Sequence, residues 1–216
     1  MYISTRGNSD GVGAAEAIRS GMVPAGGLYV PAEIPVFSRD ELLSMQDYSY
    51  PQLALRIMEP FLDGFGEKEI ENCVINAYNR ENFAHPLIAP LHRLNEQIYF
   101  LELWHGPTAA FKDMALQIMP FLLVLAKEKT GGSAETIILV ATSGDTGKAA
   151  LEGFKDVPGI RIIVFYPHGG VSKVQELQMV TTDGMNTHVV AVEGNFDDCQ
   201  TAVKEVFADE FLKKDI

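Results

Sequence analysis

Cysteine and histidine are scarce in this sequence, and their scarcity limits the chemistry that the chain can support. The two cysteines, Cys73 and Cys199, lie far apart and form no C-x-x-C pair. They therefore provide neither a disulfide framework nor a dithiol redox motif. None of the 5 histidines lies at a metal-ligand spacing from another. We therefore predict no metal site and a reducing compartment.

Long apolar runs are absent as well. The longest one, residues 114 to 126, is interrupted by Gln117 and Pro120. It is shorter than the roughly 20 apolar residues that a membrane-spanning helix needs. The opening residues, MYISTR, lack the basic and then apolar regions of a signal peptide. These absences predict a protein without a membrane segment, located in the cytoplasm.

Positive charge is in short supply. The 216 residues contain 17 Lys and Arg against 29 Asp and Glu, which gives a net charge of −12. An acidic surface repels phosphate backbones and anionic headgroups, so the charge argues against a nucleic-acid or membrane partner. A locally positive pocket for a small anion stays compatible with this balance. The hydrophobic share of 47% is that of an ordinary folded domain.

The first part of the chain, residues 1–95, is predicted to be a small and mostly helical domain. Ser38 to Glu41 (SRDE) has the pattern of a capping box at a helix start. Helices are predicted from Pro51 to Leu62 and from Glu67 to Tyr78 by their apolar spacing. A glycine-rich turn runs into a short extended stretch that ends at Pro31.

Residues 96–216 alternate between apolar strands and helices, which is typical of a parallel sheet covered by helices on two sides. The predicted strands are 98–101, 136–141, 161–166 and 187–192. Helices are predicted from after Phe111 to about Lys129, from the turn at 142–148 to about Phe154, and over 172–180 and 197–212. The fold class is therefore α/β, with a three-layer domain. Because the chain breaks off after three or four strands, we expect it to be part of a longer protein.

A lysine lies between apolar and aromatic residues in the segment His105 to Asp113 (HGPTAAFKD). Apolar surroundings and a nearby helix start favour the neutral amine, which is the form that attacks an aldehyde. From this segment alone, an exposed Lys112 with its stem packed on Phe111 fits equally well.

A turn rich in glycine and hydroxyl residues, Thr142 to Lys148 (TSGDTGK), follows the strand 136–141 and leads into a helix. Backbone amides at the start of a helix, at the carboxyl edge of a parallel sheet, form an anion site. The glycine spacing excludes both a P-loop and a dinucleotide fingerprint. Read alone, the turn is also compatible with a purely structural role.

Together, the lysine segment and this turn resemble those of fold-type II pyridoxal-phosphate enzymes, whose fold is that of the tryptophan synthase β subunit. Three strings are similar to threonine synthase sequences and follow that family's order: Gly26–Pro31, His105–Asp113 and Glu193–Cys199. The resemblance implies a threonine synthase N-terminal domain followed by part of the pyridoxal-phosphate domain, truncated at its carboxyl end.

The resemblance also implies roles for individual residues. Lys112 would bind pyridoxal 5'-phosphate as an imine and would move protons as base and acid, in a pocket shaped by Phe111 and His105. The cofactor ring and the substrate carboxylate would be flanked by Ser143, Gly144, Asp145 and Thr146, beside Thr142. Candidate ligands of the substrate phosphate, each of which also fits an ordinary helix cap or surface position, are Ser172, Lys173, Gln178 and Asn195.

The reaction implied by the resemblance converts O-phospho-L-homoserine and water into L-threonine and phosphate. The loop that binds the cofactor phosphate would lie beyond residue 216, so we expect this portion alone to be inactive. Two alternatives stay open: a related fold-type II phospholyase or dehydratase, and a non-catalytic binding module that keeps the fold. The sequence does not decide between a monomer and a homo-oligomer.

Overall fold

The computed structural model describes residues 1–209 and divides the chain into two units. The first unit contains residues 1–101 and 121–133, and the second contains residues 102–120 and 134 onward. The chain therefore crosses between the units more than once. None of the helices within residues 1–209 is long and apolar enough to cross a membrane.

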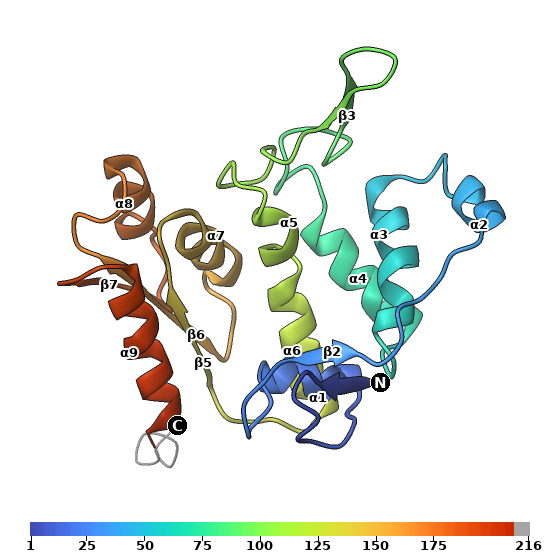
Figure 1. The fold of residues 1–216 in the computed structure, drawn as a ribbon. Helices are drawn as coiled ribbons and strands as arrows, with labels where there is room; N and C mark the ends of the chain where they lie inside the picture. The colour runs from blue at the N-terminus through green and yellow to red at the C-terminus, as the bar shows by residue number, and fades with distance from the viewer. Residues whose placement is uncertain (210–216) are drawn as a thin grey trace. The chain divides into compact units, whose positions relative to one another are not determined.

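The first unit is mainly helical, as its sequence predicts (Figure 1). Its helices are α1 (Ala14–Ser20), α2 (Arg39–Ser44), α3 (Tyr50–Met58), the 3-10 helix η1 (Glu59–Phe61), α4 (Glu67–Ala77) and most of α6 (Met119–Lys129). Its short strands are β1 (Tyr2–Ser4), β2 (Tyr29–Pro31), β3 (Leu91–Arg93) and β4 (Tyr99–Leu101). The core includes the fully buried side chains Val23, Ile70, Val74 and Phe83.

Capping residues set the helix starts in this unit. The predicted capping box is present, because Ser38 accepts from the amide of Glu41 while the Glu41 carboxylate accepts from the amide of Ser38. A second box joins Ser49 and Gln52 at the start of α3. The helix predicted to reach Leu62 ends at Met58, because Pro60 cannot continue the hydrogen-bond ladder.

One predicted strand has a different partner from the one expected. The stretch 98–101 does form β4, but β4 pairs in antiparallel register with β3 and not with the parallel sheet. The prediction that it contributes to that sheet is wrong. Asn95 makes the hairpin turn, where its side chain accepts from the amides of Gln97 and Ile98. A turn this short forces the two flanking strands to run in opposite directions.

The second unit contains the predicted parallel sheet, with strand order β5-β6-β7. The strands are β5 (Thr136–Ala141), β6 (Ile160–Pro167) and β7 (Thr187–Val192), and the helices are α5 (Asp113–Leu116), α7 (Asp145–Phe154), α8 (Lys173–Val180) and α9 (Phe196–Ala208). The central strand β6 is the most buried of the three, with Ile162 and Val164 fully covered. A strand with neighbours on both sides leaves little surface to water.

Helices cover both faces of the sheet, which gives the predicted three layers. Both α7 and α9 contact β5 and β6, and Figure 1 shows them on opposite sides of these strands. On the α7 face, a Cβ on Gly147 would lie 2.8 Å from Val164, so the helix approaches the sheet closely there. The last predicted helix begins at Phe196, and its expected end at Leu212 falls outside the described residues.

The predicted continuous helix from after Phe111 to about Lys129 is interrupted. Helix α5 ends at Leu116 and α6 begins at Met119. Pro120 explains the break, because proline is accepted in the first turn of a helix but not in its interior. The interruption leaves α5 as a short helix that begins directly after Lys112.

Candidate active site

The lysine segment folds into a tight turn that is fixed by Asp113. Its carboxylate is fully buried and accepts the Thr108 amide at 2.9 Å and the Thr108 hydroxyl at 2.6 Å. Hydrogen bonds to a charged group are the stronger kind, and a buried carboxylate requires them. Because Asp113 follows Lys112 directly, this pair sets the backbone on which the lysine is carried.

The same turn contains backbone features that only particular residues allow. Ala109 has a φ of 56°, in the left-handed region that side chains with a Cβ rarely adopt. A Cβ on Gly106 would lie 2.5 Å from the Cβ of Asp113, so glycine is needed there. Strained turns of this kind are concentrated at functional sites, because the rest of the structure must hold them in place.

The amine of Lys112 forms no ion pair within residues 1–209. Lys112 precedes α5 with helical backbone angles, and its side chain is half-buried. Its Nζ lies 4.4 Å from the centre of the Phe111 ring, which is 62% exposed. An amine that is not held by a carboxylate is able to react with a carbonyl compound.

His105 is held in place by its neighbours. Its Nε2 lies 2.7 Å from the Glu102 carboxylate, and its ring packs 5.6 Å from the ring of Trp104. Both members of the His105–Glu102 pair are largely covered. A carboxylate partner fixes the orientation of an imidazole ring, so His105 presents a defined edge.

The second predicted turn is organised around the buried hydroxyl of Thr142. This oxygen accepts from the amides of Gly144 (3.0 Å) and Gly147 (2.9 Å) and donates to the Gly144 carbonyl (3.2 Å). Its hydrogen bonds are therefore all made within the turn. Thr142 supports the loop from beneath, a role different from the predicted contact with substrate.

The upper side of this turn carries free donors. Ser143 and Thr146 are exposed, and within the described part of the chain neither hydroxyl has a hydrogen-bond partner. The amides of Asp145 and Thr146 lie in the first turn of α7, where a helix has no internal acceptor for them. The exposed Asp145 carboxylate is engaged by the Gln175 side chain at 2.8 Å. The turn therefore presents donors suited to an anion.

Both turns belong to the second unit, and packed helices connect them. Helices α5 and α7 are in contact, and a Cβ on Gly153 would lie 2.1 Å from the Leu116 carbonyl oxygen. Only glycine allows this close approach. The helix that follows Lys112 and the helix that follows Ser143 are therefore neighbours in space.

Three of the predicted phosphate ligands have local structural roles. Ser172 caps α8, and Lys173 is 73% exposed and pairs with Glu176 at 2.9 Å. Asn195 caps α9 by accepting from the amides of Asp197 and Asp198. The fourth residue, Gln178, is half-buried on α8. Through the Gln175 side chain, which bonds both the Ser172 amide and the Asp145 carboxylate, the start of α8 lies close to the 143–147 turn. Binding of a phosphate by these four residues stays a prediction.

A polar cluster behind α8 was not predicted. The buried Tyr166 hydroxyl lies 3.4 Å from Glu176, and burial raises the pKa of this tyrosine. The hydrogen bond from Lys173 lowers the pKa of the Glu176 carboxyl. Asp113 and Gln175 were missed as well, although Asp113 is within the lysine string and Gln175 stands three residues after a capping serine. That S-x-x-Q spacing is the signal that would have found Gln175.

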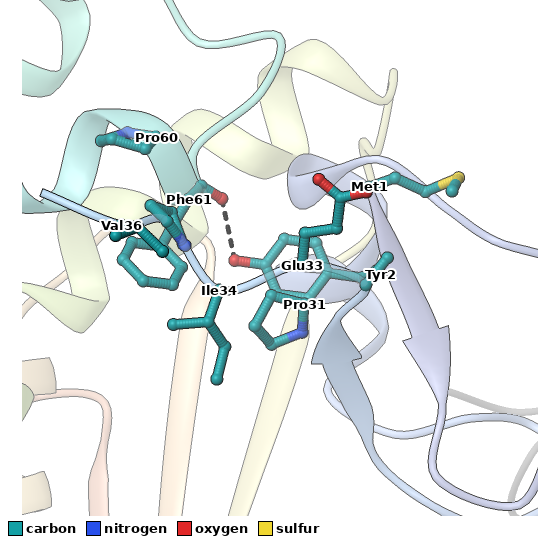
Figure 2. A pocket seen from close by; sticks show the side chains of 10 residues that line it. Met1, Tyr2, Pro31, Glu33, Ile34, Val36, Pro60 and Phe61 are labelled. Carbon is teal, nitrogen blue, oxygen red and sulfur yellow. Dashed lines mark hydrogen bonds between the residues drawn. The ribbon is translucent and has the colours of Figure 1, made fainter.

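A separate pocket of about 570 Å³ lies in the first unit. Tyr2 is one of the residues that line it, and Figure 2 shows its side chain pointing toward Phe61. The Tyr2 hydroxyl donates to the Phe61 carbonyl at 2.8 Å. Its wall is formed by the strap from Pro31 to Val36 together with Pro60. None of the predicted site residues lines this pocket, so it is distinct from the candidate active site.

The fold and the two turns define a class of protein. A lysine without an ion pair lies on a strained turn, and the helix that follows it packs on α7, whose start carries a donor-rich turn at the edge of a parallel sheet. Donor-rich turns at that edge of an α/β sheet are typical of proteins that bind small anionic molecules. Family models agree with this and are more specific. Residues 84–213 match the model described as pyridoxal-phosphate dependent enzyme, and residues 1–78 match the threonine synthase N terminus. The chain belongs to the pyridoxal-phosphate dependent enzyme family.

Curated relatives extend the similarity over nearly the whole chain. The chain is 44% identical to a threonine synthase of Pseudomonas aeruginosa over 216 residues, which is 98% of this chain and 45% of that protein. It is 38% identical to a threonine synthase of Schizosaccharomyces pombe, over 99% of this chain and 43% of that one. Human threonine synthase-like 2 is 39% identical over 99% of this chain and 44% of its own length.

Solved structures give the same result. A pyridoxal-phosphate-bound threonine synthase of Brucella melitensis matches with a TM-score of 0.87 and 38% identity, over 97% of this chain and 44% of that one. Yeast threonine synthase matches with a TM-score of 0.88 and 32% identity, over 98% of this chain and 44% of that one. The chain therefore spans less than half the length of these relatives.

The residues present fit pyridoxal phosphate at its aldehyde end. The Lys112 amine forms no ion pair within residues 1–209 and its side chain is only half-buried, which suits attachment to an aldehyde. The aromatic ring of Phe111 lies directly beside that amine. The hydroxyls of Ser143 and Thr146 offer donors to the anionic oxygens of a cofactor or substrate.

Proposed function

We propose that the whole protein is a threonine synthase, which converts O-phospho-L-homoserine and water into L-threonine and phosphate. The observation that carries the proposal is similarity to threonine synthases along 98% of the chain, with Lys112 unpaired in its strained turn. A chain that had lost the activity would have no need to keep a reactive amine there.

Lys112 has two tasks in this proposal. It would attach the cofactor through its amine, and after release it would take protons from the substrate Cα and Cβ and return protons to Cγ, which becomes the methyl group, and to Cα. Bound pyridoxal phosphate supplies the electron sink that makes these carbon-bound protons removable. Lys112 forms no ion pair within residues 1–209, which supports both tasks. An ammonium paired with a carboxylate would have to break that contact before it could react.

The 143–147 turn holds the substrate anion in this proposal. Ser143 and Thr146 donate from their hydroxyls, and the first-turn amides of α7 add the positive end of the helix dipole. Glycine is needed at 144, because its φ of 137° is one that residues with a Cβ rarely adopt and the Gln175 amide group fills the space that a Cβ would take. Phe111 borders the amine. In this proposal His105 helps to shape the cofactor pocket, and the Glu102 contact fixes the edge that His105 presents.

The direct test is the reaction of the full-length enzyme. With pyridoxal phosphate and O-phospho-L-homoserine, we expect threonine and phosphate to form in equal amounts. Lys112→Ala should lose at least about 1000-fold in rate, because both attachment and proton transfer need the amine. Threonine synthesis at an unchanged rate by that variant would refute the proposal.

A phospholyase that acts on another phosphorylated amine is the second candidate. The observation that keeps it open is the 39% identity to human threonine synthase-like 2, a relative whose name marks it as similar to threonine synthases and not as one of them. That identity is close to the 38% shared with the Schizosaccharomyces pombe threonine synthase. Assays with O-phospho-L-homoserine and with phosphoethanolamine, run side by side, separate the two functions. A non-catalytic binding module would convert neither compound, with or without the Lys112→Ala substitution.

The proposal also assigns two domains to the chain. Residues 1–95 form an N-terminal domain, and residues 96–216 form part of the cofactor-binding domain. Support comes from the family models, which meet between residues 78 and 84. Because the chain covers only 45% of a relative's length, we propose that residues 1–216 alone have no activity. Threonine formation by the purified 216-residue chain would contradict this.

A further inference from the structure

The side chain of Gln175 connects two turns that are far apart in the sequence. Its Nε2 donates to the Asp145 carboxylate at 2.8 Å, and its Oε1 accepts from the Ser172 amide at 3.0 Å. Only this orientation of the amide group satisfies both partners, since a carboxylate cannot donate and a backbone amide cannot accept. Both the Nε2 and the Oε1 atoms of Gln175 are therefore engaged in hydrogen bonds.

Gln175 also packs against the candidate anion turn. A Cβ on Gly144 would lie 2.4 Å from the Cδ of Gln175, so the amide group occupies the space that a side chain at 144 would take. Thr142 holds the amides of Gly144 and Gly147 from the opposite side. The turn is thus held between a buried hydroxyl and an amide that reaches across from α8.

The contact between Gln175 and Asp145 affects substrate binding, because Asp145 is negatively charged. A carboxylate beside an anion-binding turn repels an anionic substrate, and the repulsion grows when water is excluded. The bond from Gln175 holds one Asp145 oxygen against α8. The hydroxyls of Ser143 and Thr146 have no such engagement within residues 1–209 and stay available.

We propose that Gln175 is a positioning residue: by holding Asp145 toward α8, it keeps the 143–147 turn open to the substrate carboxylate. The inference rests on the proposed function and extends it to a residue that does not touch the reacting atoms. Helix capping alone does not account for the geometry, because a cap needs only the Ser172 contacts and not the one to Asp145.

Gln175→Glu separates the two roles. Glutamate serves a capping box as well as glutamine does, so a residue that only caps tolerates this change. In the positioning role, the new carboxylate faces Asp145 and displaces it. We expect the KM for O-phospho-L-homoserine to rise about tenfold or more, since the two carboxylates repel each other and Asp145 turns toward the substrate anion. The value of kcat should change less, and thermal unfolding should confirm that the variant folds.

A double variant provides the rescue. In Gln175→Glu with Asp145→Asn, the amide at 145 can donate to the glutamate at 175, so the contact re-forms with its direction reversed. We expect the KM to recover most of its loss relative to Gln175→Glu. Gln200→Glu on α9 is the matched control, because Gln200 is exposed and bonded to Lys204, so an added charge there should leave the KM unchanged.

Amide hydrogen exchange measures the contact independently of activity. The Gly144 and Gly147 amides should exchange faster in Gln175→Glu and return toward the original rates in the double variant. Unchanged KM and exchange in Gln175→Glu would overturn the inference, as would faster exchange without a rise in KM. If the unsubstituted enzyme makes no threonine, the proposed function fails, and the exchange rates still decide whether Gln175 holds the turn.

Discussion

Thr108 and Asp113 carry the contact on which the lysine turn depends. We expect Thr108→Val to destabilise the fold by about 1.5–3 kcal/mol, because it removes a hydrogen bond to a buried charge and keeps the side-chain shape. Urea unfolding of the full-length enzyme measures the loss. Thr201→Val, at an exposed position on α9, is the control and should change stability by less than about 0.5 kcal/mol. Equal effects of the two substitutions would contradict the role given to Thr108.

At the same scale, the sequence predicts some site residues and misses others for physical reasons. Lys112 and Ser143 stand in strings whose chemistry can be read without coordinates. The contact between Asp113 and Thr108 depends on the left-handed backbone of Ala109, which no residue preference indicates. Gln175 reaches Asp145 across 30 positions, so only the folded sheet brings them together. The roles of the predicted site residues stay predictions until variants are measured.

At the scale of elements, Gly153 sets the distance between α5 and α7. Gly153→Ala should destabilise the fold by about 1–3 kcal/mol, because a Cβ there meets the Leu116 carbonyl and forces the helices apart. This is the net effect, because the cost of the steric clash is larger than the stabilisation of about 1 kcal/mol that replacing glycine by alanine normally gives inside a helix. Gly132→Ala is the control, since its Cβ would meet nothing closer than 3.6 Å. A more stable Gly153→Ala enzyme would show that the two helices are not tightly packed.

The parallel strands are well predicted because their apolar runs are bounded by turn residues on both sides. The strands 136–141 and 187–192 agree with the structure residue for residue, and 161–166 differs by one residue at each end. Pairing is harder to predict than the strands themselves. The sequence of 98–101 does not say that its partner is 91–93, because the intervening turn decides the direction of the strand. Short elements such as α1 carry too few residues for a periodic signal.

At the scale of the whole molecule, acid should weaken the fold through carboxylates with lowered pKa values. The Ser38 hydrogen bonds lower the pKa of Glu41, and the Lys129 hydrogen bond lowers that of Glu69. A carboxyl whose pKa is lower in the folded state than in the unfolded state stabilises the fold at pH values above its unfolded-state pKa, near 4.5. This stabilisation is lost as the pH falls through the folded-state pKa. Urea unfolding at pH 7 and pH 3.5 should show this loss.

Glu69→Gln tests the source of that acid sensitivity. The substitution removes the titrating group but keeps a side chain that can accept from the Gly66 amide. We expect its stability to fall less between pH 7 and pH 3.5 than that of the unsubstituted protein. An identical fall in both proteins would mean that Glu69 and its Lys129 contact play no part.

The proposed function depends on Lys112 as the residue to which the cofactor is attached. The most direct measurement is borohydride reduction of the full-length enzyme with pyridoxal phosphate, followed by mass spectrometry of its peptides. We predict one pyridoxyl group per chain, on the peptide that contains Lys112, and none on that peptide in Lys112→Ala. A pyridoxyl group found instead on Lys148 or Lys173, with Lys112 unmodified, would contradict the account.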